Sequence, residues 1–178
     1  MKTSKPAKPS IYIYHMQECD PKKCTALKLG RLGLARVVYN INALPRGSLL
    51  LYPFAEEILS PADRSVVEGR GVSAVDCSWN RIEKLPSTGR FVARHLPFLL
   101  AANPIHYSIP YKLSTLEAVA ATLHITGFEE EAGSLLSKMK WGPTFLTLNK
   151  EPLSLYSTAK DGDAIKKIEE DYKKGYNI

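Results

Sequence analysis

The sequence predicts an α/β protein with a parallel sheet in its first half and mostly helices in its second half. Short β-rich runs alternate with helix-like segments up to about residue 95, a pattern typical of parallel sheets. After Asn103-Pro104 the composition shifts to helical patterns. We therefore expect an α/β domain over residues 1–95 and a mostly helical domain over residues 96–178.

The strands of the first half are predicted from their β-branched, aromatic and apolar residues. We expect strands at residues 11–15, 48–52, 71–78 and 89–94. A basic, helix-like run covers residues 26–36. A short helix is expected to begin at Ser60-Pro61, because serine is a good N-cap and proline fits the first helical position.

The helices of the second half carry clear start and stop signals. Ser114 and Glu117 form the pattern of a capping box, so a helix is expected from Ser114 to Ile125, and Gly127 stops it. Two more helices are expected at residues 129–139 and 163–174.

Two junctions between apolar and polar sequence are candidates for a functional cleft. The apolar run from Leu96 to Ala102 stops at Asn103-Pro104, where proline forces the chain out of helical geometry. The mostly apolar residues 71–75 are likewise followed by a polar junction, which contains Asp76 and Trp79. Ligands of α/β proteins bind where buried strands end in loops, so we expect both junctions to border one cleft.

The composition restricts the class of protein. The chain has 178 residues and no run of about 18 apolar residues, so no membrane partner is expected. Three cysteines are an odd number, which argues against a disulfide framework and for a reducing, cytoplasmic setting. The basic start of the chain lacks the apolar stretch of a secretory signal.

The formal net charge of +6 indicates an anionic partner, of which nucleic acid is the commonest. Acidic residues are sparse between residues 21 and 55, so the basic residues there have few local partners. A solvated face is the plain alternative to a surface that follows phosphates. The candidate RNA-binding residues are Lys22, Lys23, Lys28, Arg31, Arg64 and Arg90.

Several segments match known functional motifs only in part. Residues 69–74 match the G-x-G-x-x-A dinucleotide pattern, but the glycines precede the expected strand, so a turn is favoured. His15, Cys19 and Cys24 could be metal ligands with Cys77 as the fourth. Their spacing matches no common zinc pattern, so we expect ordinary buried or loop cysteines and no metal. The common hydrolase, Walker and zinc-protease motifs are missing.

Four motifs in order resemble the aminocarboxypropyltransferase family of small-subunit ribosomal RNA, and the resemblance covers nearly the whole chain. The motifs are Asp20–Thr25, Asp76–Trp79, Leu96–Pro104 and Lys112–Ala118, and Trp141–Phe145 with Asn149 is similar to the family's C-terminal signature. The resemblance implies a fold similar to the knotted SPOUT methyltransferases, with a parallel sheet, a trefoil knot and following helices.

The resemblance also implies an unusual use of S-adenosylmethionine (SAM). The family transfers the 3-amino-3-carboxypropyl group to N3 of a hypermodified pseudouridine, and methylthioadenosine leaves. Thr25 and Asp76 should then lie near the amino-acid part of SAM, Val75 beside them, and Trp79 should shield the methyl group. The adenosine pocket should contain Leu51, Pro53, Leu99, Leu100, Tyr111, Thr115 and Ala118.

Two points stay open at this level. Uridine N3 is weakly acidic, so Asp76 is the candidate general base, although it could instead only hold the amino group of SAM. The alternatives to the whole interpretation are a SPOUT-type RNA methyltransferase and a non-catalytic, RNA-binding ribosome-assembly factor. The partner is expected to be small-subunit ribosomal RNA or a pre-ribosomal particle, and the protein is expected to be a monomer.

Overall fold

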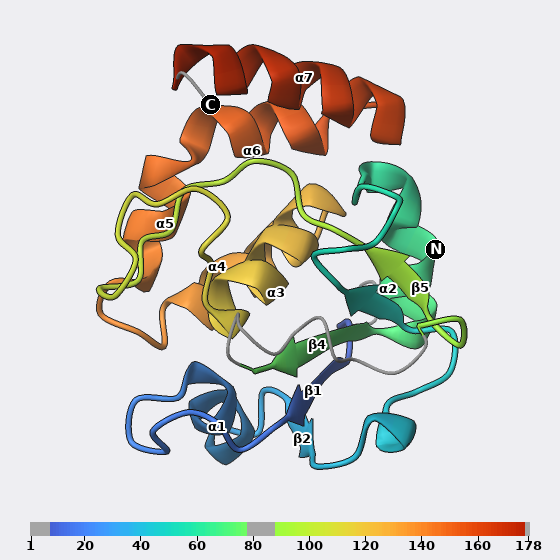
Figure 1. The fold of residues 1–178 in the computed structure, drawn as a ribbon, viewed down its shortest axis with the longest axis vertical. Coiled ribbons are helices and arrows are strands. Elements are labelled where there is room, and N and C mark those ends of the chain that lie inside the picture. The colour runs from blue at the N-terminus through green and yellow to red at the C-terminus, as the bar shows by residue number, and fades with distance from the viewer. Residues whose placement is uncertain (1–7, 78–87, 177–178) are drawn as a thin grey trace, which may run out of the picture.

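A five-stranded parallel sheet forms the centre of the protein (Figure 1). The structure is a computed structural model that describes residues 8–77 and 88–176. Its sheet order is β2-β1-β4-β3-β5, and every neighbouring pair is parallel. The strands are β1 (Ile11–His15), β2 (Arg36–Val38), β3 (Leu49–Leu51), β4 (Val72–Asp76) and β5 (Val92–Arg94). The predicted parallel α/β architecture is confirmed.

Helices dominate the second half of the chain, as predicted. The described helices are α1 (Thr25–Arg31), α2 (Arg64–Arg70), α3 (Thr115–Ile125), α4 (Glu129–Leu136), α5 (Gly142–Leu148), α6 (Lys150–Ser157) and α7 (Gly162–Gly175). Two 3-10 turns, η1 (Ile41–Ala43) and η2 (Pro61–Asp63), complete the set. Helices α5 and α6 were not predicted from the sequence.

The predicted helix over residues 26–36 is too long. Helix α1 ends at Arg31, and Gly33 adopts a left-handed conformation with φ 67°. The Leu34 N–H then donates to the Leu29 carbonyl at 3.0 Å, which closes the helix end. The chain turns there into β2, a strand that was not predicted.

The two faces of the sheet pack differently. On one face, Ile11, Ile13, Leu49 and Leu51 join a large core to which α3, α4 and α6 contribute buried residues. On the other face, Leu50 packs in a smaller cluster beside η1 and the partly buried tyrosines of β1. The large core takes buried residues from both predicted domains, so helices after residue 113 pack directly on strands before residue 95.

Only the second glycine of the dinucleotide-like pattern lies in the turn that was expected before the strand. Gly69 lies in α2, and Gly71 follows that helix with φ 80°. A Cβ at Gly71 would lie 2.5 Å from the Ser10 carbonyl oxygen, so glycine is required by close backbone approach. The turn leads directly into β4.

The buried run before Asn103-Pro104 is not a regular strand, in contrast to its expected role as a strand leading to a loop. Residues 98–103 are buried but belong to no strand or helix. Leu99 and Ala101 bond to the backbone of residues 108–111, and the other residues of the segment bond to side chains of later helices. The Glu169 carboxylate accepts from Phe98 N at 2.9 Å, and the Tyr156 hydroxyl donates to Phe98 O at 3.0 Å.

Asn149 and Glu117 complete this pairing. Asn149 accepts from Leu100 N and donates to Leu100 O, both at 2.8 Å. Glu117 accepts from Ala102 N at 2.6 Å and from Asn103 N at 3.1 Å. Buried backbone groups need hydrogen-bond partners. Four side chains supply them here in place of a neighbouring strand: Glu117 of α3, Asn149 between α5 and α6, Tyr156 of α6 and Glu169 of α7.

Within the described residues, no helix is both long enough and apolar enough to cross a membrane.

Candidate functional site

Two cavities open side by side where the parallel strands end. Both are lined by Cys77, Leu113, Ser114 and Thr115, so they meet at the end of β4 and the beginning of α3. The carboxyl edge of a parallel sheet is the usual place for ligands in α/β proteins. We call the cavity beside β3 and β5 the inner cavity, and the cavity beside the loop after β1 the outer cavity.

The inner cavity has a volume of about 440 Å³ and is largely apolar. Its walls come from the ends of β3, β4 and β5 and from α3 and α7, and include Leu51, Pro53, Val75, Leu96, Leu113 and Ala118. A pocket of this size is adequate for part or all of a small ligand.

The beginning of α3 is fixed by its predicted capping box. The Ser114 side chain accepts from Glu117 N at 3.3 Å, and the Glu117 carboxylate accepts from Ser114 N at 2.7 Å. The next residue, Thr115, donates its hydroxyl hydrogen to Asp76 Oδ1 at 2.8 Å. The capping box therefore places Thr115 against the end of β4, between the two cavities.

A polar group from α7 closes one side of the inner cavity. Tyr111 has φ 62°, and its hydroxyl donates to the Glu169 carboxylate at 2.8 Å. Burial, together with this carboxylate, raises the pKa of Tyr111 to about 12. Lys173 lines the same cavity, and its ammonium lies 3.5 Å from Glu169. Its contacts with Tyr111 and Glu169 raise the pKa of Lys173.

The outer cavity has a volume of about 760 Å³ and is bounded by three segments far apart in sequence. These are the loop after β1, the end of β4 and the loop at Asn103, with residues before α5 on the far side. Its walls include Glu18, Lys23, Thr25, Asp76, His106, Met139 and Trp141. The cavity therefore combines charged groups with an apolar, aromatic wall.

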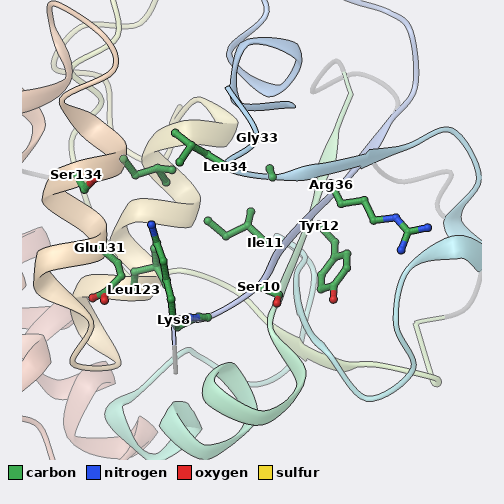
Figure 2. A pocket seen from close by; sticks show the side chains of 13 residues that line it. Lys8, Ser10, Ile11, Tyr12, Gly33, Leu34, Arg36, Leu123, Glu131 and Ser134 are labelled. Carbon is green, nitrogen blue, oxygen red and sulfur yellow. The ribbon is translucent and has the colours of Figure 1, made fainter. Parts of the chain in front are cut away.

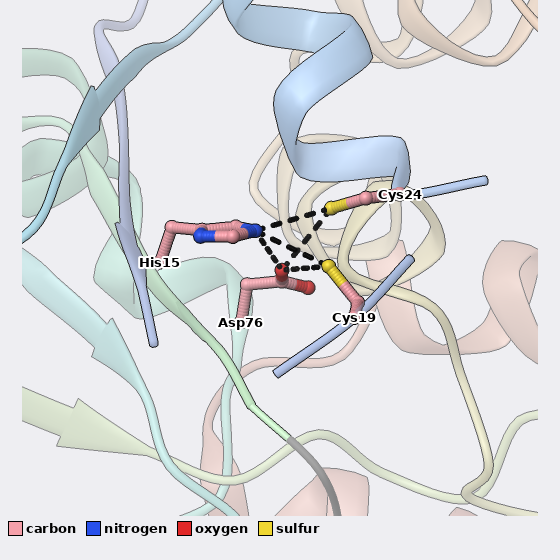
Figure 3. Close-up of side chains that lie close together, drawn as sticks. All are labelled: His15, Cys19, Cys24 and Asp76. Carbon is pink, nitrogen blue, oxygen red and sulfur yellow. Dashed lines mark hydrogen bonds and ion pairs between the residues drawn. The ribbon is translucent and has the colours of Figure 1, made fainter. Parts of the chain in front are cut away.

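Four potential metal ligands converge beside the outer cavity (Figure 3). They are His15, Cys19, Cys24 and Asp76, and their donor atoms all lie within 4.8 Å of one another. His15 ends β1 and Asp76 ends β4, and the two residues are paired in register. Burial raises the pKa of both the Cys19 and the Cys24 thiol, and the Asp76 carboxylate contributes in the same direction.

Most of the predicted SAM-binding residues lie around the two cavities. Leu51, Pro53, Val75, Tyr111, Thr115 and Ala118 line the inner cavity, and Thr25, Asp76 and again Thr115 line the outer one. Leu99 and Leu100 are buried and line neither cavity. Both backbone groups of Leu100 are already bonded to Asn149. Trp79 lies outside the described residues.

The predicted RNA-binding residues fall into two groups. Lys22 and Lys23 are exposed beside the outer cavity, Lys28 is half-buried on α1, and Arg31 is exposed but donates to Pro21 O at 2.8 Å. Arg64 and Arg90 instead bond to the protein itself. Arg64 donates to the carbonyls of Thr126 and Gly127, and Arg90 donates to Asn42 and Leu44. These two arginines therefore tie loops together.

Sequence reasoning missed several residues of the cavity walls. Lys173 and Trp141 come from segments far from the strand ends, and no local pattern assigned them to the site. Trp141 was noted only as part of the C-terminal signature. A third cavity, of about 360 Å³, lies at the amino end of β1 and contains none of the predicted site residues (Figure 2).

Comparison with known proteins identifies the family. A 16S rRNA aminocarboxypropyltransferase from Methanothermobacter thermautotrophicus is 48% identical over 164 residues, which are 91% of this chain and 97% of that protein. The chain belongs to the 16S rRNA aminocarboxypropyltransferase family. Another aminocarboxypropyltransferase of that name, from Methanocaldococcus jannaschii, is 45% identical over 92% of this chain and 96% of its own length.

A solved aminocarboxypropyltransferase has the same fold. The structure of the SAM-dependent rRNA:acp-transferase Tsr3 from Vulcanisaeta distributa superposes with a TM-score of 0.84 and 43% identity. The match covers 95% of this chain and 94% of that one. A family model described as "Ribosome biogenesis protein, C-terminal" matches residues 49–173. A second model, described as "Possible Fer4-like domain in RNase L inhibitor, RLI", matches residues 9–40.

Proposed function

We propose that this protein transfers the 3-amino-3-carboxypropyl group of SAM to N3 of a pseudouridine, or N1-methylpseudouridine, in small-subunit ribosomal RNA. The observation that carries the proposal is the convergence of motifs from four parts of the chain on two joined cavities. The first predicted domain supplies Leu51, Pro53 and Val75, and the second supplies Thr115 and Ala118. Membership of the aminocarboxypropyltransferase family supports the same reaction.

The two cavities suit the two ends of SAM. The apolar inner cavity fits adenosine, with Leu51, Pro53 and Ala118 against the base. The outer cavity fits the amino-acid part, because Thr25 and Asp76 offer polar groups on its otherwise apolar wall. Thr115 lies at the boundary, where the sulfonium would be placed. The backbone of Leu100 is occupied by Asn149, so Leu99 and Leu100 would support the pocket from behind.

This placement decides which carbon of the sulfonium reacts. The methyl group would be buried against apolar walls, while the carbon next to sulfur in the amino-acid chain would face RNA at the outer cavity. N3 of the uracil ring loses its weakly acidic proton to solvent water, and its electron pair forms the bond to that carbon. The carbon–sulfur bond breaks, and its electron pair stays on sulfur, so methylthioadenosine leaves. Proximity and orientation are the main contributions that such a pocket supplies.

The contacts of Asp76 favour a positioning role over proton abstraction. Oδ1 accepts a hydrogen bond from Thr115 at 2.8 Å, and Oδ2 lies 3.2 Å from Cys24 Sγ and 3.4 Å from His15 Nε2. Both oxygens therefore have neighbours within the protein. We propose that Asp76 fixes Thr115 and the floor of the amino-acid site.

Identification of the by-product tests the proposed reaction. The purified protein, incubated with SAM and small-subunit RNA carrying the unmodified base, is expected to release methylthioadenosine, detected by liquid chromatography and mass spectrometry. Release of S-adenosylhomocysteine would replace the proposal with a methyltransferase. Absence of SAM binding by calorimetry would indicate a non-catalytic assembly factor.

RNA is expected to approach over the loop between β1 and α1. Replacing Lys22 and Lys23 with alanine should weaken RNA binding and make the slope of log K against log salt less steep by about 1 to 2. The reason is that each lost lysine leaves one phosphate unneutralised, so fewer counterions are released when RNA binds. The matched control replaces Lys166 and Lys167 of α7, which Figure 1 draws at the opposite end of the molecule from α1. Equal salt slopes for both double variants and the unmodified protein would contradict the proposal that RNA binds over the loop between β1 and α1.

Three further expectations belong to this proposal. The SPOUT-like trefoil knot stays a prediction that comes from the family resemblance alone, and mechanical extension of the chain tests it, because a knotted chain stretches to a shorter length. The monomeric state stays a prediction, which light scattering during gel filtration tests. The cytoplasmic setting also stays a prediction.

A further inference from the structure

The four side chains of Figure 3 come from segments that the fold brings together at one point. His15 ends β1, Cys19 lies in the following loop, Cys24 caps α1, and Asp76 ends β4. His15 and Cys24 are buried, and Asp76 is 17% exposed. Two thiols, an imidazole and a carboxylate are an unusual set to gather in a protein interior for packing alone.

The separations of the donor atoms fit a single ion at their centre. In a tetrahedral zinc site with bonds of 2.0 to 2.3 Å, neighbouring ligand atoms are about 3.3 to 3.8 Å apart. His15 Nε2 lies 3.2 Å from Cys19 Sγ, 3.6 Å from Cys24 Sγ and 3.4 Å from Asp76 Oδ2. Asp76 Oδ2 lies 3.5 Å from Cys19 Sγ and 3.2 Å from Cys24 Sγ. Five edges of the tetrahedron are thus near the expected length.

An iron–sulfur cluster does not fit these residues, although the model that matches residues 9–40 carries a Fer4-like description. A ferredoxin-type cluster is held by four cysteines. Residues 9–40 contain two, Cys19 and Cys24, and the whole chain contains three. The irons of a cluster would also spread their ligands farther apart than these four donors lie.

We propose that His15, Cys19, Cys24 and Asp76 bind one zinc ion as a structural site. Sulfur and imidazole ligands in tetrahedral arrangement select zinc among the common divalent metals. All four positions are filled by protein atoms, which is typical of structural and not of catalytic sites. The ion would cross-link β1, the following loop, the start of α1 and the end of β4.

One contact must change when the ion binds. Gln17 N donates to His15 Nδ1 at 3.1 Å, so the neutral imidazole carries its proton on Nε2, the atom that would bind zinc. Zinc binding therefore moves the proton to Nδ1 and breaks this hydrogen bond. Gln17 has φ 59°, in the left-handed region, and the loop at Gln17 is the part of the site expected to rearrange.

Zinc at this position would define the role of Asp76. Oδ2 would be bound to the ion, and Oδ1 accepts from Thr115, so both oxygens would be engaged and the carboxylate would be a weaker base toward RNA. Through Thr115 the ion would also fix the boundary between the two cavities. The site itself rests on the four donors alone and does not depend on the proposed transfer reaction.

Metal analysis of the full-length protein tests the site. After equilibration with zinc and gel filtration, mass spectrometry of the elements is expected to find about one zinc per chain. The Cys19→Ser/Cys24→Ser variant should lose it, and the control Cys77→Ser, which removes a thiol outside the four donors, should keep it. Equal zinc contents in the unmodified protein and the double variant would overturn the proposal.

A cobalt titration keeps the test valid if the double variant fails to fold. Metal-free protein titrated with Co²⁺ should develop thiolate-to-cobalt absorption that saturates at one equivalent, and Cys24→Ser should give about half its intensity. The backbone amide signal of Gln17 should shift with the same stoichiometry. No thiolate absorption in folded, unmodified protein would overturn the site. Calorimetry with SAM, run separately, reports on the proposed function alone.

Discussion

Replacing Ala118 with phenylalanine is expected to weaken SAM binding by at least about 100-fold, or about 2.7 kcal/mol. Ala118 lies on α3, and its side chain forms part of the wall of the inner cavity. A phenyl ring at this position would project into the space assigned to adenosine. Isothermal titration calorimetry with SAM measures the effect directly.

The control for this experiment is Ala118→Ser, which adds one small atom to the same wall. It should bind SAM within about threefold of the unmodified protein, and both variants should unfold at similar temperatures, since the added group points into a cavity. Unchanged affinity of folded Ala118→Phe would place adenosine elsewhere.

Replacing Glu117 with alanine is expected to lower the free energy of unfolding by about 3 to 5 kcal/mol. Glu117 is 0% exposed, and its carboxylate accepts from Ala102 N, Asn103 N, Asn103 Nδ2 and Ser114 N. Removal of the carboxylate leaves these buried donors without their acceptor. Denaturant unfolding followed by circular dichroism measures the loss.

The matched control is Glu170→Ala, because Glu170 is an exposed glutamate within α7. It should change the free energy of unfolding by no more than about 0.5 kcal/mol. Similar effects of the two substitutions would show that the bonds of Glu117 contribute little to stability.

The predictable part of the fold is the part with strong local patterns. The runs at residues 11–15, 48–52 and 71–78 contain β1, β3 and β4, and the capping box predicted the start of α3. Strand β2 has only three residues and follows a helix with similar basic residues. The hydrophobic pattern therefore did not show where the helix ends and the strand begins. Helices α5 and α6 were missed because they are short, with seven and eight residues, and follow each other without a turn signal between them.

The cluster of His15, Cys19, Cys24 and Asp76 shows why the candidate site could be only partly predicted. His15, Cys19 and Cys24 were noted together, but Cys77 was considered as the fourth ligand. Neighbouring residues of a strand point to opposite faces of the sheet, and the register pairs His15 with Asp76. Asp76, not Cys77, therefore lies beside the histidine. Local sequence carries no information on the register between strands so far apart.

The irregular segment at residues 98–103 has a consequence for the order of folding. Its backbone partners are Glu117, Asn149, Tyr156 and Glu169, which belong to later parts of the chain. Residues 99 and 101 also bond to the nearby backbone of residues 108–111, but the amides of Phe98, Leu100 and Ala102 gain their partners only when α3, α6 and α7 are packed. We therefore expect the amides of Phe98, Leu100 and Ala102 to exchange with solvent deuterium only through global unfolding, although none lies in a strand.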